Sequence, residues 1–334
     1  MSMTLTLLGF ACCLLLAGLA GCWLTTLALK RKVESLLPPQ GRFIDLPGAR
    51  LHVREFGAGP AILMIHGLGG QMAHFTYAVA AQLAGRFRVV VVDRPGSGWS
   101  TASGGADLST QAAALAALAE RLALGRPLVV GHSLGGAVAL ALALEHPDRV
   151  SGLALLAPLT HMHAGDRVPD VFKGLMIRPA PLRQLVAWTV ATPRSIGKSK
   201  QTLEQVFGPD TVPHDFGMRG GGLLSLRPSA YLAASNDLQA LPARLPLQQQ
   251  RYGQLRLPLG ILFGRDDRIL DWRANGQALA DKVAGARLEL IDGGHMLPVT
   301  RPDACVRLIL EVAQGSGLAG FAADSGTQQA GGAR

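Results

Sequence analysis

A serine at the centre of the pentapeptide GHSLG, residues 131–135, is the clearest candidate nucleophile in the sequence. An apolar run over 127–130 predicts a short strand before it, and an Ala/Leu-rich run predicts a helix after it. This context is typical of a nucleophile elbow, in which Gly131 and Gly135 allow a turn too sharp for larger residues. The helix N-terminus would then favour an anion that develops at Ser133. A tight turn that carries a surface serine is the alternative interpretation.

A second glycine-rich motif, HGLGG at residues 66–70, follows a predicted strand over Ala61–Ile65. Such a loop can expose the backbone N–H of Leu68, and the N–H of Leu134 lies directly after the candidate nucleophile. Two backbone donors aimed at one point form an oxyanion hole, which stabilises the tetrahedral intermediate of acyl transfer. An ordinary glycine-rich turn is the other interpretation of this motif.

An acid and a base follow the candidate nucleophile along the chain. Asp267 lies in the loop GRDD and His295 in the loop GGH, and each loop comes after a predicted strand. The carboxyl ends of parallel strands meet at one edge of a sheet, so we expect Ser133, Asp267 and His295 to lie together. In that triad His295 is the general base, and Asp267 orients it during formation of an acyl-enzyme. Asp266 is the competing candidate for the acid.

Neither a metal nor a cofactor is predicted. The pair His161 and His163 has metal-ligand spacing but no third ligand in view, and His132 is expected to be a packing residue. The cysteines form neither a CxxC pair nor a disulfide framework; they are Cys12, Cys13, Cys22 and Cys305.

The elements that must position these groups alternate along the chain. Short apolar strands separated by longer helices are typical of a mostly parallel sheet with helices on both faces. Ser109 is a plausible cap for a helix over 108–124. The predicted strands lie at about 61–65, 88–92, 127–130, 150–156, 259–263 and 286–291, and further helices at 72–84, 136–145, 272–283 and 302–314.

The predicted domain organisation departs from this alternation in three places. Residues 159–255 contain Pro and Gly breaks and helical pieces, which indicates a helical cap inserted into the α/β catalytic domain at 43–158 and 256–314. A proline pair indicates a linker over 33–42. The Gly/Ser/Gln-rich residues 315–334 predict a disordered tail.

The N-terminus predicts a membrane segment, assigned to residues 1–32. Residues 1–29 carry no charged side chain and end at Lys30-Arg31-Lys32. As a helix they would rise about 43 Å, enough to cross a hydrocarbon core of about 30 Å. A cleaved signal is less consistent with this length and with the missing basic residues before the apolar run.

A lipoprotein segment is a further possibility, because Leu19-Ala20-Gly21-Cys22 resembles a bacterial lipobox. All three interpretations place the protein at a membrane. The basic cluster after the apolar run favours a cytoplasmic catalytic domain, and a periplasmic domain stays open.

Composition excludes other classes of protein. Hydrophobic residues make up 49% of the chain, too many for a disordered protein. The net charge of +9 comes with only 5% aromatic residues and no basic stripe, so nucleic-acid binding is not predicted.

These motifs together resemble the α/β-hydrolase fold superfamily, in the branch of esterases and lipases with a helical cap. The resemblance covers about residues 42–314, and the cap matches least. It implies that Ser133 is the nucleophile, His295 the base and Asp267 the acid, with the oxyanion hole at Leu68 and Leu134. The motifs are HGLGG (66–70), DRPGSGWS (93–100), GHSLGG (131–136), HPDRVSGLALLAP (146–158), GRDDRIL (264–270) and GGHMLPVTRPD (293–303).

The predicted function is hydrolysis of carboxylic esters, of the acylglycerol or lipid type. The cap carries 11 Lys/Arg and 6 Asp/Glu beside many apolar residues, which suits a lipid substrate near an anionic membrane. Membrane-anchored monoacylglycerol lipases resemble this arrangement of an apolar helix followed by the same fold.

Other functions stay open on the same residues. Carbon–carbon bond hydrolases, thioesterases, perhydrolases and acyltransferases share the triad, because a fold does not determine a substrate. Epoxide hydrolases and haloalkane dehalogenases use Asp at the position of Ser133, which argues against both. A non-catalytic binding protein is the remote alternative, since such proteins usually lack a triad member.

Overall fold

A nine-stranded sheet forms the centre of the computed structural model, which describes residues 3–162 and 168–318. The strand order is β1-β2-β4-β3-β6-β7-β8-β9, and β5 pairs with β2 at the edge. Strands β1, β2 and β5 pair antiparallel, and the six others form a parallel block. The strands are β1 Arg42–Leu46, β2 Ala49–Phe56, β3 Ala61–Ile65, β4 Arg88–Val92, β5 Thr101–Ala102, β6 Leu128–His132, β7 Gly152–Leu156, β8 Leu259–Gly264 and β9 Arg287–Ile291.

The register of the parallel strands brings their carboxyl ends into one row. Ile65 of β3 lies opposite Val92 of β4 on one side and Gly131 of β6 on the other. Gly264 of β8 lies opposite Ile291 of β9. The loops after β3, β6, β8 and β9 therefore leave the sheet at the same edge, as the sequence predicted.

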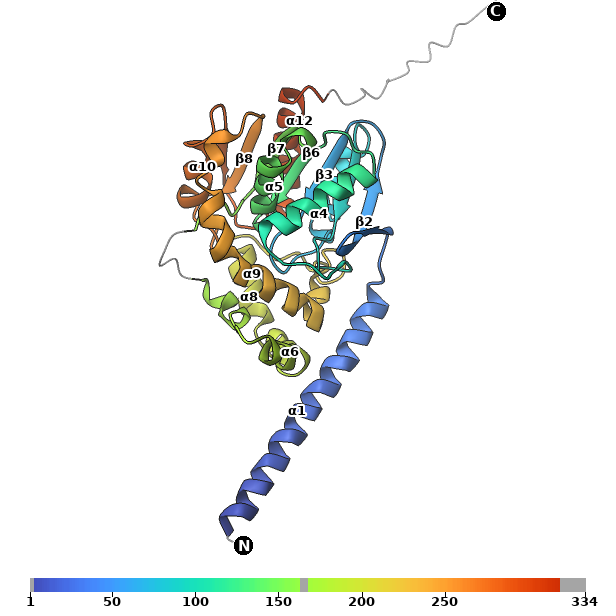
Figure 1. Ribbon diagram of the computed structural model, residues 1–334, viewed down its shortest axis with the longest axis vertical. Helices are drawn as coiled ribbons and strands as arrows, with labels where there is room; N and C mark the ends of the chain where they lie inside the picture. The colour runs from blue at the N-terminus through green and yellow to red at the C-terminus, as the bar shows by residue number, and fades with distance from the viewer. Residues whose placement is uncertain (1–2, 163–167, 319–334) are drawn as a thin grey trace, which may run out of the picture.

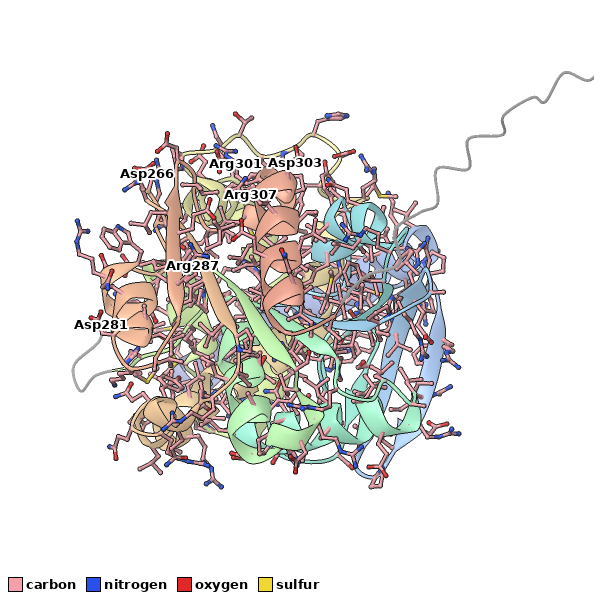
Figure 2. All side chains as sticks on the ribbon, turned by 90° about the horizontal axis from the view of Figure 1, so that it is seen from above. Asp266, Asp281, Arg287, Arg301, Asp303 and Arg307 are labelled. Atoms are coloured by element: carbon pink, nitrogen blue, oxygen red, sulfur yellow. The ribbon has the colours of Figure 1, made fainter. Side chains whose placement is uncertain are left out.

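Helices cover both faces of the sheet. Helices α4 and α5 pack together on one face, and α12 packs on β7 and β8 from the other face, where it also contacts α3 (Figures 1 and 2). Apolar strands such as AILMI and RVVVV are buried on both sides, as expected for a parallel sheet between two helical layers. These helices are α3 Val79–Leu83, α4 Leu108–Arg121, α5 Leu134–Glu145 and α12 Pro302–Gly315.

The segment between β7 and β8, called here the cap segment (residues 159–255), is helical in its described part. It gathers below the sheet in Figure 1, beside the carboxyl ends of the strands. Leu238, Leu241 and Leu245 of α9 join the main hydrophobic core, which ties the cap segment to the sheet. Its helices are η2 Asp170–Leu175, α6 Ala180–Trp188, α7 Ala191–Gly197, α8 Ser199–Phe207, η3 Gly222–Leu226, α9 Pro228–Gln248 and η4 Tyr252–Gln254.

The N-terminal helix α1 extends from Met3 to Leu36 and projects away from the rest of the protein (Figure 1). It is the one described helix long and apolar enough to cross a membrane. The predicted linker 33–42 was placed too early, because the helix continues to Leu36. Val33 is buried and Lys30 pairs with Glu34 one turn away, so these residues extend the helix until Pro38 ends it.

Two predicted helices were wrong in detail, and a third, at 302–314, is confirmed with one more residue. Residues 72–84 form two short helices, α2 Ala73–Thr76 and α3, because Ala78 between them has a non-helical backbone at φ −150°. Residues 272–283 begin as a π-turn, η5 Arg273–Gln277, before α10 Ala278–Ala280. Helix α12 includes Gly315, the first residue of the predicted tail, and the rest of that tail from 319 lies outside the described residues. The remaining short helices are η1 Pro147–Arg149 and α11 Leu297–Thr300.

The cap of α4 was also wrong. The side chain of Asp107, two residues before the predicted Ser109, accepts hydrogen bonds from the N–H and hydroxyl of Thr110 at 3.2 and 2.7 Å. Ser109 instead donates to Glu145 on the surface.

Replacing the true cap should cost more stability than replacing the predicted one. Asp107→Ala leaves an N-terminal N–H of α4 without its acceptor, so we expect a loss of about 1 kcal/mol in the free energy of unfolding. Ser109→Ala, the matched control, should change it by less than half as much. Thermal unfolding of the full chain in detergent micelles measures both, and equal losses would contradict this assignment.

Candidate active site

Ser133 lies in a strained turn between β6 and α5. Its backbone has φ 54° and ψ −123°, a conformation that non-glycine residues rarely adopt. The turn is held at both ends, since the N–H of Ser133 donates to the carbonyl of Leu156 at 3.0 Å and its carbonyl accepts from Gly136 at 2.8 Å. Strain that persists at one polar residue points to a functional position.

The glycines around Ser133 are required by close packing. A Cβ on Gly131 would lie 2.6 Å from the carbonyl oxygen of Gly135, and a Cβ on Gly135 would lie 2.2 Å from the carbonyl oxygen of Ile65. Helix α5 therefore begins directly against the backbone of β3. This contact explains both glycines that the sequence predicted for the elbow.

The loop HGLGG reaches the same point. A Cβ on Gly67 would lie 2.8 Å from the Cβ of Ser133 and 3.3 Å from its Oγ, so the loop passes directly over the serine. Leu68 follows in this loop, and Leu134 opens α5, whose first N–H groups have no partner within the helix. The structure thus brings the two predicted oxyanion residues to the surroundings of Ser133.

His295 and Asp267 form a hydrogen bond. The Nδ1–H of His295 donates to Oδ2 of Asp267 at 2.7 Å, and both side chains are almost fully buried. The other carboxylate oxygen accepts from the backbone N–H groups of Ile269 and Leu270, at 2.8 and 3.0 Å. With Nδ1 donating, Nε2 of His295 stays available as a proton acceptor.

The competing carboxylate lies elsewhere. Asp266 is exposed and sits at the periphery of the molecule (Figure 2). His132 packs against the ring of His295 with centroids 5.0 Å apart and donates from Nε2 to the His295 carbonyl at 3.0 Å. It holds the loop of His295 from behind, in agreement with the packing role that we predicted.

A cavity of about 920 Å³ opens above these residues. Ser133, His295, Leu68 and Leu134 line its floor, while Asp267 lies behind His295. The walls come from the cap segment and are mostly apolar, which suits a ligand with a hydrocarbon part. They include Phe172, Leu175, Leu203, Val206, Leu223, Leu226, Tyr231, Leu238 and Leu241.

Known proteins match most of this chain. The family model described as alpha/beta hydrolase fold matches residues 60–192. A pimeloyl-[acyl-carrier protein] methyl ester esterase of Chromobacterium violaceum is 32% identical over 272 residues, which cover 78% of this chain and 97% of that protein. The chain belongs to the α/β-hydrolase fold family. A magnesium-chelatase 30 kDa subunit of Rhodobacter capsulatus is also similar, at 31% identity over 77% of the hydrolase and 88% of that subunit.

Solved structures agree with the fold of the hydrolase. The enol-lactonase from Burkholderia xenovorans LB400 superposes with a TM-score of 0.67 at 22% identity, covering 82% of the hydrolase and all of that chain. A thermophilic esterase from Thermogutta terrifontis superposes with a TM-score of 0.63 at 21% identity, covering 83% and 99%. At this identity the likeness concerns the fold alone.

A buried ion pair that the sequence did not indicate lies beneath the HGLGG loop of the hydrolase. Arg94, fully buried, pairs with Asp237 of α9 at 2.9 Å and also donates to Gln111 at 2.8 Å. Its guanidinium donates to the carbonyls of His66 and Gly67 at 2.9 and 3.0 Å. The Gly67 carbonyl belongs to the same peptide group as the N–H of Leu68, so Arg94 fixes the direction of that N–H.

Asp210 of the cap segment is a second group near the site that the sequence did not indicate. Its carboxylate accepts from the N–H of Gly294 at 3.0 Å and pairs with Arg301 at 2.6 Å. A Cβ on Gly294 would lie 2.3 Å from the carbonyl oxygen of Gly208, so the loop before His295 packs tightly on the cap segment. Asp210 and Asp237 gave no local signal, because their partners lie far away in the sequence.

No metal site is found among the residues that the structure describes, which contain no group of three His, Cys, Asp or Glu able to hold an ion. His161 packs edge-on against Tyr252 and bonds to Thr160. His163, its predicted neighbour in spacing, lies outside the described residues.

Three buried histidines close to the site have lowered pKa values. Burial lowers the pKa of His66 well below 6.5, and the cation of Arg94 lowers it further. Burial lowers the pKa of His74 to about 4. Burial and the nearby His295 lower the pKa of His132. All three are therefore neutral in the folded protein at pH 7.

Breaking the Arg94–Asp237 pair should destabilise the protein strongly. Asp237→Ala leaves a buried guanidinium without its counterion, and we expect a loss of about 3–5 kcal/mol in the free energy of unfolding. Glu120→Ala is the matched control, because it removes the acid of the exposed Arg149–Glu120 pair and should cost less than about 1 kcal/mol. Similar losses for the two variants, measured in detergent micelles, would refute the structural role of the buried pair.

Acidification should destabilise the protein through the three histidines. Below pH 6.5 the unfolded chain binds protons that the folded protein does not bind, so stability falls as the pH falls towards 4. Each histidine contributes up to about 1.4 kcal/mol per pH unit in this window. Unfolding curves between pH 7.5 and 5 measure the slope, which should be smaller in His74→Gln. A flat profile would contradict the prediction.

Proposed function

We propose that this hydrolase cleaves carboxylic esters through a catalytic triad of Ser133, His295 and Asp267. One observation carries the proposal: His295, hydrogen-bonded to the buried Asp267 behind it, shares a cavity floor with a serine in a strained strand-to-helix turn. These are the three roles of nucleophile, base and orienting acid that acyl transfer requires.

The reaction would proceed in two steps. Nε2 of His295 takes the hydroxyl proton of Ser133 as Oγ attacks the ester carbonyl carbon, and the tetrahedral oxyanion is held by the N–H groups of Leu68 and Leu134. The tetrahedral intermediate then collapses, and the alcohol departs with the proton from His295. The acyl group stays bound to Ser133 as an acyl-enzyme. In the second step His295 takes a proton from water, whose oxygen attacks the acyl carbon. The bond between that carbon and Oγ then breaks, Ser133 regains its proton from His295, and the carboxylic acid leaves. Asp267 stabilises the imidazolium in both steps.

An ester with a long acyl chain fits the cavity best. The cap segment supplies mostly apolar walls, and a volume near 920 Å³ is at the upper end of ligand sites. Similarity to a methyl ester esterase supports the ester class. We therefore propose lipid or acylglycerol-type esters as substrates, with the cap segment at 159–255 as a lid domain over the catalytic domain at 43–158 and 256–314.

We further propose that α1 anchors the hydrolase in a membrane. Residues 3–18 are exposed over their whole length, and an 18-residue window of this helix has a mean hydropathy of 2.2. Exposed apolar helix surface of this extent is stable only in lipid or detergent. Lys30, Arg31 and Lys32 follow on the side of the catalytic domain, which favours the cytoplasmic face.

Substitutions in the triad should abolish ester hydrolysis without unfolding the protein. Ser133→Ala and Asp267→Asn should lower kcat for p-nitrophenyl esters by about 10⁴-fold, because each removes a role that the others cannot replace. Asp266→Asn is the matched control and should leave kcat within about twofold. Acyl chains from acetyl to palmitoyl, tested with the full chain in micelles, define the preferred length.

Two outcomes would count against the proposal. Equal losses in Asp266→Asn and Asp267→Asn would reject the assignment of the acid. A folded wild-type protein that hydrolyses none of the esters would reject simple ester hydrolysis and lead next to thioesters, carbon–carbon bond substrates and acyl transfer.

A further inference from the structure

The apolar part of α1 is longer than a membrane requires. It runs from Met3 to Leu29 without a charge, whereas about 20 residues cross the hydrocarbon core. Residues 3–18 are fully exposed, and from residue 19 onward one side of the helix is shielded at Leu19, Cys22 and Thr26, spaced three and four apart. The helical turns of α1 that exceed the length needed to cross the membrane, from residue 19 onward, are therefore the turns that pack on the rest of the protein.

The cap segment holds these turns in place. Helix α1 contacts α6, α7 and η3, and the hydroxyl of Thr26 donates to the carbonyl of Thr189 at 3.2 Å in a buried position. About two turns further along α1, Glu34 pairs with Arg227 at 3.5 Å, and Arg227 stacks over Trp99 of the catalytic domain at 4.4 Å. Helices α6 and α7 thus have a fixed position along α1, beside its last apolar turns.

The free surface of α6 and α7 is apolar. Four large side chains there are at least 41% exposed: Leu182, Leu185, Val190 and Ile196, called here the α6–α7 patch. Figure 1 shows α6 at the end of the protein towards which α1 extends, so the helix that carries Leu182 and Leu185 lies on the side of the anchor. Exposed apolar side chains that cluster in one place mark a contact surface.

The same stretch carries only positive charge. Residues 176–200 contain five basic residues and no acidic residue. An amphipathic surface with apolar side chains between Lys and Arg is typical of a segment that lies in the interface of an anionic bilayer. The basic residues are Arg178, Arg183, Arg194, Lys198 and Lys200.

We propose that the α6–α7 patch inserts into the headgroup region of an anionic lipid bilayer, the same bilayer that α1 spans. This inference rests on the proposed anchor. It has a consequence for access to the cavity, because Ser195, Ser199 and Thr202, next to the patch, form part of the cavity wall. A lipid substrate can then pass from the bilayer into the cavity without crossing water.

The test uses a fluorophore on the patch of the full chain. In a background with Cys12, Cys13 and Cys22 replaced by alanine and the buried Cys305 retained, Leu185→Cys or Leu247→Cys is labelled with the environment-sensitive dye NBD. Leu247 is the matched control. Its side chain is similarly exposed, at 58% against 50% for Leu185, but it lies at the carboxyl end of α9, outside the α6–α7 patch. The proteins are reconstituted into vesicles of phosphatidylcholine with or without an equal part of phosphatidylglycerol.

We expect shallow lipid nitroxides to quench the dye at position 185 about twofold more than the dye at position 247, and more with phosphatidylglycerol than without it. Arg194→Gln with Lys198→Gln and Lys200→Gln should remove the dependence on phosphatidylglycerol. The matched control variant replaces three other arginines with glutamine and should retain the dependence on phosphatidylglycerol. These arginines lie at the amino ends of the strands and are Arg126, Arg256 and Arg287.

An alkaline wash of the vesicles separates this inference from the anchor. If the protein stays in the vesicles but the dye at 185 is not quenched, the patch faces water or another protein and the inference is wrong while the anchor stands. If the wash removes the protein, the anchor and the inference both fail. Equal quenching with and without phosphatidylglycerol would reject the anionic partner.

Discussion

The turn at Ser133 is the constraint on which the other parts of the site depend. A serine at φ 54° costs about 1–3 kcal/mol of backbone strain, which only a surrounding structure can maintain. Hydrogen bonds to Leu156 and Gly136 maintain it here, and Gly135 lets α5 start in contact with β3. The direction of α5 and the close approach of the HGLGG loop both follow from this one turn.

The cap segment also supports the loops that surround Ser133. Asp237 neutralises Arg94, which fixes the peptide group before Leu68, and Asp210 holds the N–H of Gly294 beside His295. Two carboxylates from the cap segment thus connect to two different loops of the floor. A displacement of the cap segment would therefore also disturb these two loops, so the position of the cap segment and the geometry of the loops are coupled.

The proposed membrane helix α1 is connected to the cap segment and, through Arg227, to a loop at the edge of the sheet. Arg227 joins α1, α9 and the loop of Trp99, so α1 is tied both to the cap segment and to the loop after β4. In the proposed function, the anchor, the α6–α7 patch and the cavity wall would together guide an apolar substrate out of the bilayer.

The sequence by itself determined the fold and the residues that gather at its edge. Buried apolar runs that alternate with amphipathic helices allow one solution, a parallel sheet between two layers, and the positions of Ser133, Asp267 and His295 after strands follow from it. Their catalytic roles stay predictions. The glycines at 131 and 135 were also predictable, because a sharp strand-to-helix turn excludes side chains.

Only the tertiary structure decided which distant groups meet. The distinction between Asp266 and Asp267 depends on the direction in which each side chain leaves a loop, and adjacent residues in a sequence do not reveal it. The partners Arg94 and Asp237 are separated by 143 residues, and Thr26 and Thr189 by 163. Periodicity reports which face of an element is buried, whereas the partner on that face is set by packing of the whole chain.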